Sequence, residues 1–333
     1  MSVIKYFSAY IFIALGYVSL THSDWRSYSM LIFSFVLIPL IELLIKENKS
    51  ANEVKQELAY DLVLYSLVPV YLILLGLFLN TIGGEMSSAS RIGKLSAMGL
   101  LSGIFGINLA HELGHRQSKF DRFLAQLLLA TSQYMHFFIE HNRGHHKRVG
   151  TFDDPATARK GEHLYAFWFR TITGSYLSAL QLEKQRLKRL EKQEWSLSND
   201  MIIYAIIQLT ILVLVGWVFG IPTLLYYLIS CLIGILLLET INYIEHYGLT
   251  RKKISASAYE RVQDVHSWNS DYVLGRVLLF ELTRHSHHHA NSQVKYARLE
   301  SRPESSQLPT GYPGMMLLSL VPPLWFRVMN KRL

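Results

Sequence analysis

Histidine is concentrated in four short segments of this 333-residue sequence, and histidine is the commonest metal ligand among protein side chains. The segments are LAHELGH (109–115), EHNRGHH (140–146), NYIEHYGL (242–249) and RHSHHHA (284–290). Many of these histidines are three or four residues apart, a spacing that places side chains on one face of a helix. Each segment is therefore expected to aim its imidazoles at one point. The nine candidate metal ligands are His111, His115, His141, His145, His146, His246, His285, His288 and His289.

Nine imidazoles are more than a single zinc ion uses, because zinc takes four ligands, or three ligands and a water. Two metal ions that share eight or nine nitrogens are better explained by iron, which imidazole suits. The one cysteine, Cys231, lies in an apolar run, so no thiolate cluster competes for this role. We therefore expect a cofactor of two non-haem Fe ions.

The stretch HELGH by itself also fits a zinc peptidase, in which two histidines four residues apart bind zinc and the glutamate is the general base. Glu112 is the candidate catalytic residue under both interpretations, either as that base or as a carboxylate that bridges or supports an iron pair. Further polar residues stand where they would accept imidazole N–H bonds and fix the orientation of the ligands. These candidate supporting residues are Asn108, Glu140, Asp153, Asp154, Glu245 and Glu281.

The remaining histidines receive other assignments. His287 is out of phase with the histidines around it, so we expect that it does not bind metal. His22 and His163 are expected at the surface, and His136 at an interface between helices. His266 is an alternative ninth ligand or a residue that supports one.

Apolar stretches precede the histidine segments and would position them. Half of the residues are hydrophobic and only 17% are charged, whereas a typical soluble protein has about 25% charged residues. We predict an all-α integral membrane protein with six transmembrane helices and a cytoplasmic histidine-rich di-metal cap. The stretches that approach the roughly 20 apolar residues needed to cross a bilayer are 4–21, 29–45, 59–82, 95–113, 201–219 and 222–245.

Positive charge sets the expected orientation, because Lys and Arg are concentrated on the cytoplasmic side of membrane proteins. Of the 33 Lys and Arg residues, only Arg26, Arg91 and Lys94 lie near the two connections that would face outward. All four histidine segments then lie on the same, cytoplasmic side. We expect a multi-pass protein of the bacterial inner membrane with a cytoplasmic active site. The first stretch is interpreted as a retained helix, because it lacks a clear signal-peptide cleavage site.

This topology divides the chain into four parts. Residues 1–115 hold the first four helices and end in the first histidine segment, and residues 116–200 form a cytoplasmic and interfacial part that contains the second. Residues 201–246 form a transmembrane hairpin that ends in the third histidine group. Residues 247–333 form a cytoplasmic C-terminal cap that contains the last one.

Three local predictions concern the polar parts. Residues 120–139 are expected to form one helix at the membrane interface, because a span there would separate His111 from His141. Gln181–Trp195 is expected to form an amphipathic helix with Glu/Lys pairs four apart, which contacts solvent and anionic lipid or docks a partner. The turn-rich LPTGYPGM (308–315) is expected to break any helix, and the apolar stretch that follows is too short to span.

Longer matches show which family this sequence resembles. The stretches NLAHELGHR, EHNRGHHKRVGTFDDPATARKGE, NYIEHYGLTR, HSWNS and LFELTRHSHHHA occur in this order, and LPTGYPGM follows them. Over roughly residues 105–320 the chain is similar to the membrane alkane monooxygenases (alkane ω-hydroxylases), within the histidine-rich membrane fatty acid desaturases and hydroxylases. NYIEHYGL is the stretch that most favours alkane hydroxylation.

The resemblance implies a non-haem di-iron enzyme that uses O2 to convert the terminal methyl of an n-alkane to a primary alcohol. It implies the nine histidines as iron ligands and a rubredoxin-type electron donor that is fed by an NADH-dependent reductase. The chain departs from the family pattern at His287, where an acidic residue is expected, and at Asn291, where a histidine is common. It is also shorter than typical members, mainly at the two termini. These departures bear on substrate range and donor docking more than on the metal site.

An alkane has no polar group, so its recognition must depend on apolar shape and length. Candidate residues for a groove that admits substrate from the lipid are Phe12, Leu31, Phe35, Tyr65 and Leu74. Because the terminal C–H bond is strong and no side chain attacks it, the oxidant must come from the metal and O2.

Basic residues near the histidine segments indicate the second class of partner. A small acidic electron carrier would be attracted to such a surface, and anionic membrane lipids would be attracted equally well. Nucleic acid is not expected, because the basic residues follow the membrane topology. The residues are Lys147, Arg148, Arg159, Lys160 and the run 251–253.

Other functions remain open on the sequence. A fatty-acyl desaturase and a hydroxylase of alkyl-aromatics such as xylene would differ from an alkane hydroxylase in their products. An intramembrane zinc protease would hold zinc in place of iron. A metal transporter would need polar residues inside the spans, whereas the ionisable residues here cluster at their cytoplasmic ends.

Overall fold

The computed structural model describes residues 3–54, 56–255 and 258–333, and this part of the chain is mostly helical. Within it, six helices are long and apolar enough to cross a membrane: Val3–Thr21, Trp25–Leu44, Glu57–Thr81, Ser88–Gly114, Asp200–Phe219 and Ile221–His246. They overlap the six predicted stretches closely, except that the second and the fourth begin earlier, at Trp25 and Ser88. The predicted all-α fold with six membrane-spanning helices is confirmed, and the protein is a multi-pass membrane protein.

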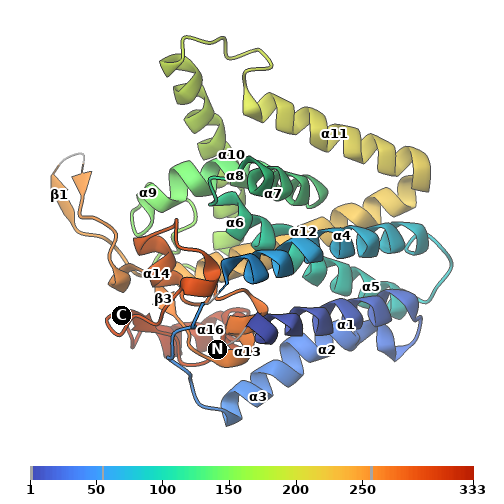
Figure 1. Ribbon diagram of the computed structural model, residues 1–333, viewed down its shortest axis with the longest axis horizontal. Helices are drawn as coiled ribbons and strands as arrows, with labels where there is room; N and C mark the ends of the chain where they lie inside the picture. The colour runs from blue at the N-terminus through green and yellow to red at the C-terminus, as the bar shows by residue number, and fades with distance from the viewer. Residues whose placement is uncertain (1–2, 55, 256–257) are drawn as a thin grey trace.

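Several of the spans are built from consecutive helical segments (Figure 1). Two of these segments, η3 and η4, are π-helical, a wider turn that occurs often at functional sites. In chain order the spans are η1 (Val3–Ser8) with α1 (Ala9–Thr21); η2 (Trp25–Tyr28), α2 (Ser29–Ile32), η3 (Phe33–Leu37) and α3 (Ile38–Leu44); α4 (Glu57–Thr81); α5 (Ser88–Leu101), η4 (Ser102–Asn108) and α6 (Leu109–Gly114); α11 (Asp200–Phe219); and α12 (Ile221–His246).

The other elements are shorter, apart from α10, and they include two pairs of very short strands. Strand β1 (Lys253–Ser255) pairs antiparallel with β2 (Ala258–Tyr259), and β3 (Trp268–Asn269) pairs parallel with β4 (Ser306–Gln307). The helical elements are α7 (Lys119–Thr131), α8 (Phe137–Glu140), η5 (His141–His145), α9 (His146–Arg148), α10 (Leu164–Arg189), η6 (Asp264–His266), α13 (Val273–Leu278), α14 (His285–Ala290), η7 (Tyr296–Arg298), α15 (Tyr312–Ser319) and α16 (Pro322–Met329).

Small residues let the fourth span approach α12 closely. A Cβ atom on Gly99 would lie 2.3 Å from Cγ2 of Ile233, and one on Gly234 would lie 2.9 Å from Oγ of Ser102. Helices in lipid associate through such small residues, because the surrounding tails are as apolar as the helix surface. This packing fixes the ends of two histidine-bearing spans relative to each other.

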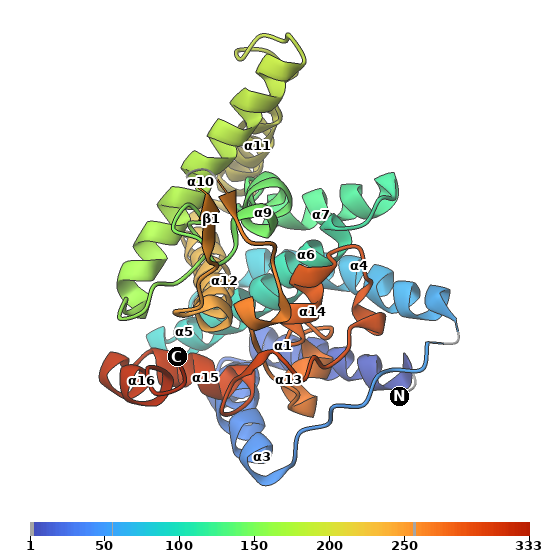
Figure 2. The same ribbon diagram turned by 90° about the vertical axis from the view of Figure 1, so that its left-hand side faces the viewer.

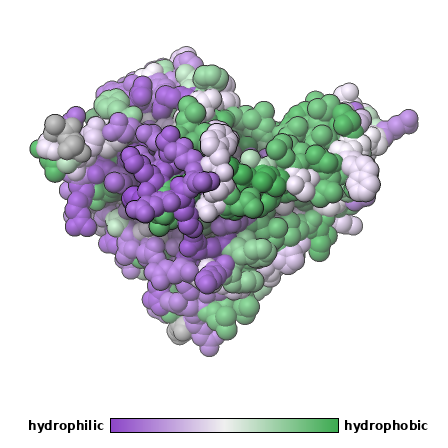
Figure 3. All heavy atoms as spheres, turned by 90° about the horizontal axis from the view of Figure 1, so that it is seen from above, coloured by the Kyte–Doolittle hydropathy of each residue, from purple (hydrophilic) through white to green (hydrophobic). Residues whose placement is uncertain are grey.

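The last two spans form the predicted hairpin. Gly220 follows α11 with φ of 85°, which favours glycine, and Pro222 lies in the first turn of α12. Helix α11 is the least buried of the six spans and lies at the outside of the bundle (Figure 1). Seen from above, hydrophobic side chains gather on the right, toward the far ends of α4, α5 and α11, and hydrophilic ones on the left (Figure 3).

Two predicted helices have different bounds in the structure. Residues 120–139 do not form one helix: α7 ends at Thr131, Gln133 has φ of 54°, and α8 begins at Phe137. The chain turns where Ser132 Oγ and Thr131 Oγ1 both donate to the carbonyl of Leu128, a bond that competes with continued helix. The helix predicted at 181–195 is the final part of α10, which begins at Leu164 and ends at Arg189.

The prediction that LPTGYPGM breaks any helix was wrong at its second half. Helix α15 begins inside the motif at Tyr312, with Pro313 in its first turn. A proline is tolerated there, because the N–H that it lacks would have no partner in the helix. The motif therefore starts a short helix, which packs against α12.

Candidate metal centre

Four parts of the chain bring the nine predicted histidines together at one end of the bundle, where α6, α9, α12 and α14 meet (Figure 2). They divide into two groups, and within each group the candidate ligand atoms lie within 4.8 Å of one another. The first group is His111, His115, His141, His146 and His288; the second is His145, His246, His285 and His289.

The first group is a closed ring of Nε2 atoms. Around the ring, neighbouring Nε2 atoms are 3.2 Å (His111–His115), 3.0 Å (His115–His141), 3.0 Å (His141–His146), 3.2 Å (His146–His288) and 3.2 Å (His288–His111) apart. These contacts cannot all be hydrogen bonds, because the nitrogen of a neutral imidazole either donates one proton or accepts one. A single cation at the centre satisfies all of the lone pairs at once.

The spacing of the ring agrees with a transition metal. Two nitrogens at right angles around an ion, each roughly 2.1 Å from it, lie about 3 Å apart. The ring distances of 3.0 and 3.2 Å are close to this value. An all-nitrogen donor set suits iron, zinc or copper and disfavours magnesium or calcium, so the residues present fit the predicted kind of metal.

The second group is an open row of Nε2 atoms. The distances are 3.2 Å from His145 to His289, 2.9 Å from His289 to His285 and 3.1 Å from His285 to His246. On its other side, Nδ1 of His145 donates to Oδ2 of Asp154 at 2.9 Å. This bond fixes the tautomer of His145 and leaves its Nε2 lone pair facing the group.

The expectation that each segment aims at one point was wrong for two segments. In an α-helix, His141 and His145 would share a face because they are four residues apart. The segment η5 is π-helical instead, so His141 lies with His146, five residues on, and His145 faces the second group. Helix α14 likewise sends His288 to the first group and its other two candidates to the second.

Burial keeps most of these imidazoles neutral. Burial first, and neighbouring imidazoles second, hold the pKa values of His115, His141, His146, His285, His288 and His289 well below the usual 6.5. A neutral imidazole keeps the lone pair that a metal needs. For His145, burial also lowers the pKa, but the Asp154 carboxylate outweighs it and the net pKa is raised.

Two of the predicted supporting residues have other partners, and a third is exposed. Asn108 Nδ2 donates to the carbonyl of Leu279 at 3.2 Å, and Glu140 accepts from Arg148 at 2.8 Å and from Ser178 at 3.2 Å. Asp153 is exposed. In the described part of the chain none of the three hydrogen-bonds to an imidazole, so the structure corrects that expectation for them.

Glu112 also turns away from the histidine nitrogens. Its Oε1 accepts from Nη2 of Arg116 at 3.1 Å and from the backbone N–H of Tyr296 at 3.3 Å. Arg116 in turn contacts Asp61 at 2.9 Å. Glu112 nevertheless lines a small cavity together with His111 and His288.

Glu281 is part of a buried ionic network that sequence patterns did not predict. Its Oε1 accepts from Lys5 Nζ at 2.6 Å and from the Tyr6 hydroxyl at 2.5 Å, while its Oε2 lies 3.0 Å from Nε of Arg276 and 3.6 Å from Nε of Arg284. Because Arg284 directly precedes His285, the network holds the start of α14. The one signal in the sequence was a lysine in the first apolar run.

The other histidines lie outside both groups. Nδ1 of His287 accepts the backbone N–H of Glu300 at 2.9 Å. His266 is 3.3 Å from Glu260, and His136 packs between the rings of Tyr134 and Tyr176. His163 accepts from the N–H of Ala166 at the start of α10, and Nδ1 of His22 contacts the carbonyl of Val18.

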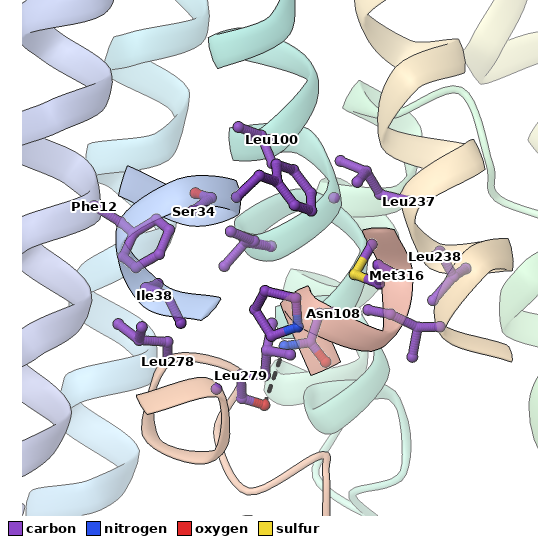
Figure 4. A pocket seen from close by; sticks show the side chains of 16 residues that line it. Phe12, Ser34, Ile38, Leu100, Asn108, Leu237, Leu238, Leu278, Leu279 and Met316 are labelled. Atoms are coloured by element: carbon purple, nitrogen blue, oxygen red, sulfur yellow. Dashed lines mark hydrogen bonds between the residues drawn. The ribbon is translucent and has the colours of Figure 1, made fainter. Parts of the chain in front are cut away.

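Three cavities that share lining residues lie between the membrane helices and the first histidine group, and the two larger ones are apolar. The outer cavity has a volume of about 530 Å³ and shares Phe35, Leu237 and Met316 with an inner cavity of about 60 Å³. The inner cavity shares Asn108 and Leu279 with a third cavity of about 10 Å³, which His111 and His288 also line. Figure 4 shows the inner cavity, with the Asn108–Leu279 hydrogen bond at one end.

Three of the predicted groove residues line these cavities. Phe12 and Phe35 line the inner one, and Leu31 lines the outer one. Tyr65 instead donates its hydroxyl to Asp121, and Leu74 is buried in the core between the helices. Phe12 and Phe35 come from the first two spans, whereas Tyr65 and Leu74 lie on the third.

Comparisons with known proteins agree with this geometry. The profile of the fatty acid desaturase family matches residues 92–316, which include all four histidine segments. An alkane 1-monooxygenase of Ectopseudomonas oleovorans is 39% identical over 297 residues, which cover 87% of this chain and 74% of that protein. Alkane 1-monooxygenase 1 of Alcanivorax borkumensis is 37% identical over 327 residues, which cover 94% and 79%.

A third relative is named for a different activity. The xylene/toluene monooxygenase hydroxylase component of Pseudomonas putida is 29% identical over 302 residues, which cover 90% of this chain and 80% of that protein. The alkane 1-monooxygenases match at higher identity over a similar length. The chain is therefore an enzyme that belongs to the fatty acid desaturase family and, within it, to the alkane 1-monooxygenases.

Proposed function

We propose that this enzyme hydroxylates the terminal methyl group of n-alkanes to primary alcohols with O2 and electrons from a protein donor. The observation that carries the proposal is the series of three cavities with shared lining residues between the membrane helices and His111 and His288, of which the two larger are apolar. The alkane 1-monooxygenases among the relatives support the same substrate class.

The proposed cofactor is two non-haem iron ions. His111, His115, His141, His146 and His288 would hold one ion, and His145, His246, His285 and His289 the other. When bound, the iron pair would supply the O2-derived oxidant that a strong C–H bond requires and that no side chain provides. The protein's own contribution is to hold neutral imidazoles in place and to keep the surroundings dry.

Apolar side chains bind and orient the substrate in this proposal. Phe35, Leu237 and Met316 line both the outer and the inner cavity, so an alkyl chain that enters from the lipid passes between them. An alkane loses no hydrogen bond on entering, whereas desolvation of a polar chain would cost free energy. The catalytic role proposed for Glu112 rests on its place in the wall of the third cavity, beside His111.

The proposed electron donor is a rubredoxin-type protein reduced by an NADH-dependent reductase. Lys147, Arg159, Lys160 and Lys252 are exposed and available to an acidic partner or to anionic lipid. Arg148 and Arg251 have internal partners, since they bind Glu140 and the backbone carbonyls of Lys147 and Glu260. The charge distribution also supports a bacterial inner membrane location with this end in the cytoplasm.

Product analysis tests the proposal. The iron-loaded protein, with rubredoxin, its reductase and NADH, is offered octane, xylene and a fatty-acyl substrate. We expect 1-octanol from octane. Oxidation of xylene alone would favour the second candidate, an alkyl-aromatic hydroxylase, which the relative at 29% identity supports. A cis-alkene from the acyl chain, or one zinc per chain with peptide cleavage, would contradict the proposal.

A further inference from the structure

Glu245 lies against the second histidine group in a way that differs from the other carboxylates. It is buried at the end of α12, and its Oε2 is 3.2 Å from Nε2 of His285. Its other oxygen, Oε1, accepts the hydroxyl of Tyr312 at 2.8 Å. The carboxylate is therefore held between α15 and the histidines.

The contrast with Asp154 shows what is unusual. Asp154 contacts His145 at Nδ1, the nitrogen that faces away from the group. Glu245 contacts His285 at Nε2, the nitrogen that also faces His246 at 3.1 Å and His289 at 2.9 Å. Nδ1 of His285 is buried and has no hydrogen-bond partner in the described part of the chain. Glu245 therefore does not orient His285 through Nδ1, as Asp154 orients His145.

One Nε2 atom cannot satisfy three such neighbours through hydrogen bonds. If the nitrogen carries the proton, it donates to Glu245 and has no lone pair for a metal; if the carboxyl group carries the proton, its O–H occupies that lone pair. If neither is protonated, the lone pair of the nitrogen and the carboxylate oxygen repel each other. A cation that accepts both removes the repulsion. An oxygen and a nitrogen at right angles, each roughly 2.1 Å from one ion, lie about 3 Å apart, near the observed 3.2 Å.

We propose that the carboxylate of Glu245 is a fifth donor to the metal of the second group, beside His145, His246, His285 and His289. The second group would then supply four nitrogens and one oxygen, against five nitrogens in the first. Glu245 is not among the atoms of the second group that lie within 4.8 Å of one another, so its carboxylate would move from its contact with His285 toward the ion when the metal binds. The inference rests on the proposed function, because it requires a metal at this position. It also gives Tyr312, in the LPTGYPGM motif, a positioning role, since its hydroxyl holds Oε1 while Oε2 faces the ion.

Cobalt(II) binding to the full-length protein tests the inference without turnover. Metal-free wild type, Glu245→Gln and Glu239→Gln are titrated with cobalt in detergent, and the bound ions per chain, the affinity against a chelator and the visible d–d spectrum are recorded. Glu239 is a matched control: it is buried on the same helix and bonded to Tyr134, Thr171 and Asn242. Thermal unfolding of each variant checks the fold.

We expect two cobalt ions in wild type and in Glu239→Gln. In Glu245→Gln, one ion should bind about tenfold or more weakly, and its spectrum at saturation should change because a charged oxygen has left the metal. A weaker site with an unchanged spectrum would mean that Glu245 acts only through a hydrogen bond, and this overturns the inference. So does wild-type behaviour of Glu245→Gln, or an equal effect of Glu239→Gln.

The test also separates this inference from the function on which it rests. Fewer than two cobalt ions in wild type would contradict the proposed metal pair, and the inference with it. Two ions in wild type with an unaltered Glu245→Gln would remove the fifth donor and leave the di-metal proposal standing.

Discussion

Each imidazole of the two groups directs its Nε2 at other Nε2 atoms over 2.9 to 3.2 Å. Without a cation, the lone pairs repel one another in surroundings of low dielectric. Metal binding and the packed arrangement of these side chains therefore stabilise each other. Single residues can be sorted by whether they supply a nitrogen, hold one in place or do neither.

His246 is the histidine that α12 supplies to the second group. His246→Ala should lose iron from one of two positions and abolish hydroxylation, because the remaining donors no longer enclose the ion. Iron per chain and 1-octanol formation measure the two effects. His287→Ala is the control: it lies outside both groups and should keep both irons. Full activity of His246→Ala would show that the assignment is wrong.

Asp154 accepts a hydrogen bond from Nδ1 of His145, the nitrogen that faces away from the second group. Its neighbour in sequence, Asp153, offers a matched control. Asp154→Ala should weaken metal binding at the second group by about 10 to 100-fold, because His145 loses its fixed orientation. Asp153→Ala removes the same charge from an exposed position and should bind metal as wild type does. Chelator competition measures both. Equal affinities in the two variants would contradict the role given to the bond between Asp154 and His145.

At the scale of elements, the histidine groups depend on departures from regular helix and on close packing. The spacing in the sequence identified which histidines come together, because side-chain type and approximate helix ends are local properties. It did not show their division between the groups, because that depends on the π-helical η5, in which residues five apart share a face. The spacing in the sequence did not predict the partners of Glu281 either, since Lys5 is 276 residues away.

The packing of α5 on α12 predicts one sensitive glycine and one tolerant glycine. Gly99→Ala should destabilise the protein by about 1 to 3 kcal/mol, because the new Cβ would lie 2.3 Å from Ile233. Gly76→Ala on α4 meets no atom within 4 Å and should be neutral or slightly stabilising. Thermal unfolding in the same detergent compares them. Equal melting temperatures of the two variants would contradict the packing argument.

At the scale of the whole molecule, the spans both cross the bilayer and line the cavities that lie between it and the histidines. The six spans followed from apolar length alone. The cavities did not follow from it, because they depend on which helix faces meet: Met316, from the C-terminal part, lines both cavities together with Phe35 and Leu237. The pattern of residues within one segment does not show which distant segments line the same cavity.

Blocking these cavities should reduce catalysis and spare the metal. Met316→Trp adds bulk where the outer and inner cavities join, so kcat/KM for octane should fall at least about tenfold, the value of a barrier increase of about 1.4 kcal/mol. Iron content should not change. Leu324→Trp is the control, because Leu324 is exposed and lines neither cavity. Unimpaired turnover by Met316→Trp would show that substrate takes another route.

Removal of the metal should affect the whole fold. Because a ligand bound only by the folded state stabilises it by about 4 kcal/mol at a thousand times its dissociation constant, a chelator should lower the melting temperature, and added Fe(II) should restore it. An unchanged melting temperature after verified loss of iron would contradict the coupling. Glu239→Gln, which leaves both groups intact, should show the same dependence as wild type.

The contacts of Lys5 and Tyr6 with Glu281 have a consequence for biogenesis. The ribosome makes these two residues 276 and 275 residues before their carboxylate partner. The first span must therefore enter the bilayer first, and the helix that carries His285 cannot be held in place by this network until Glu281 has been made. A polypeptide that stalls before this point would insert into the membrane without an assembled site for its cofactor.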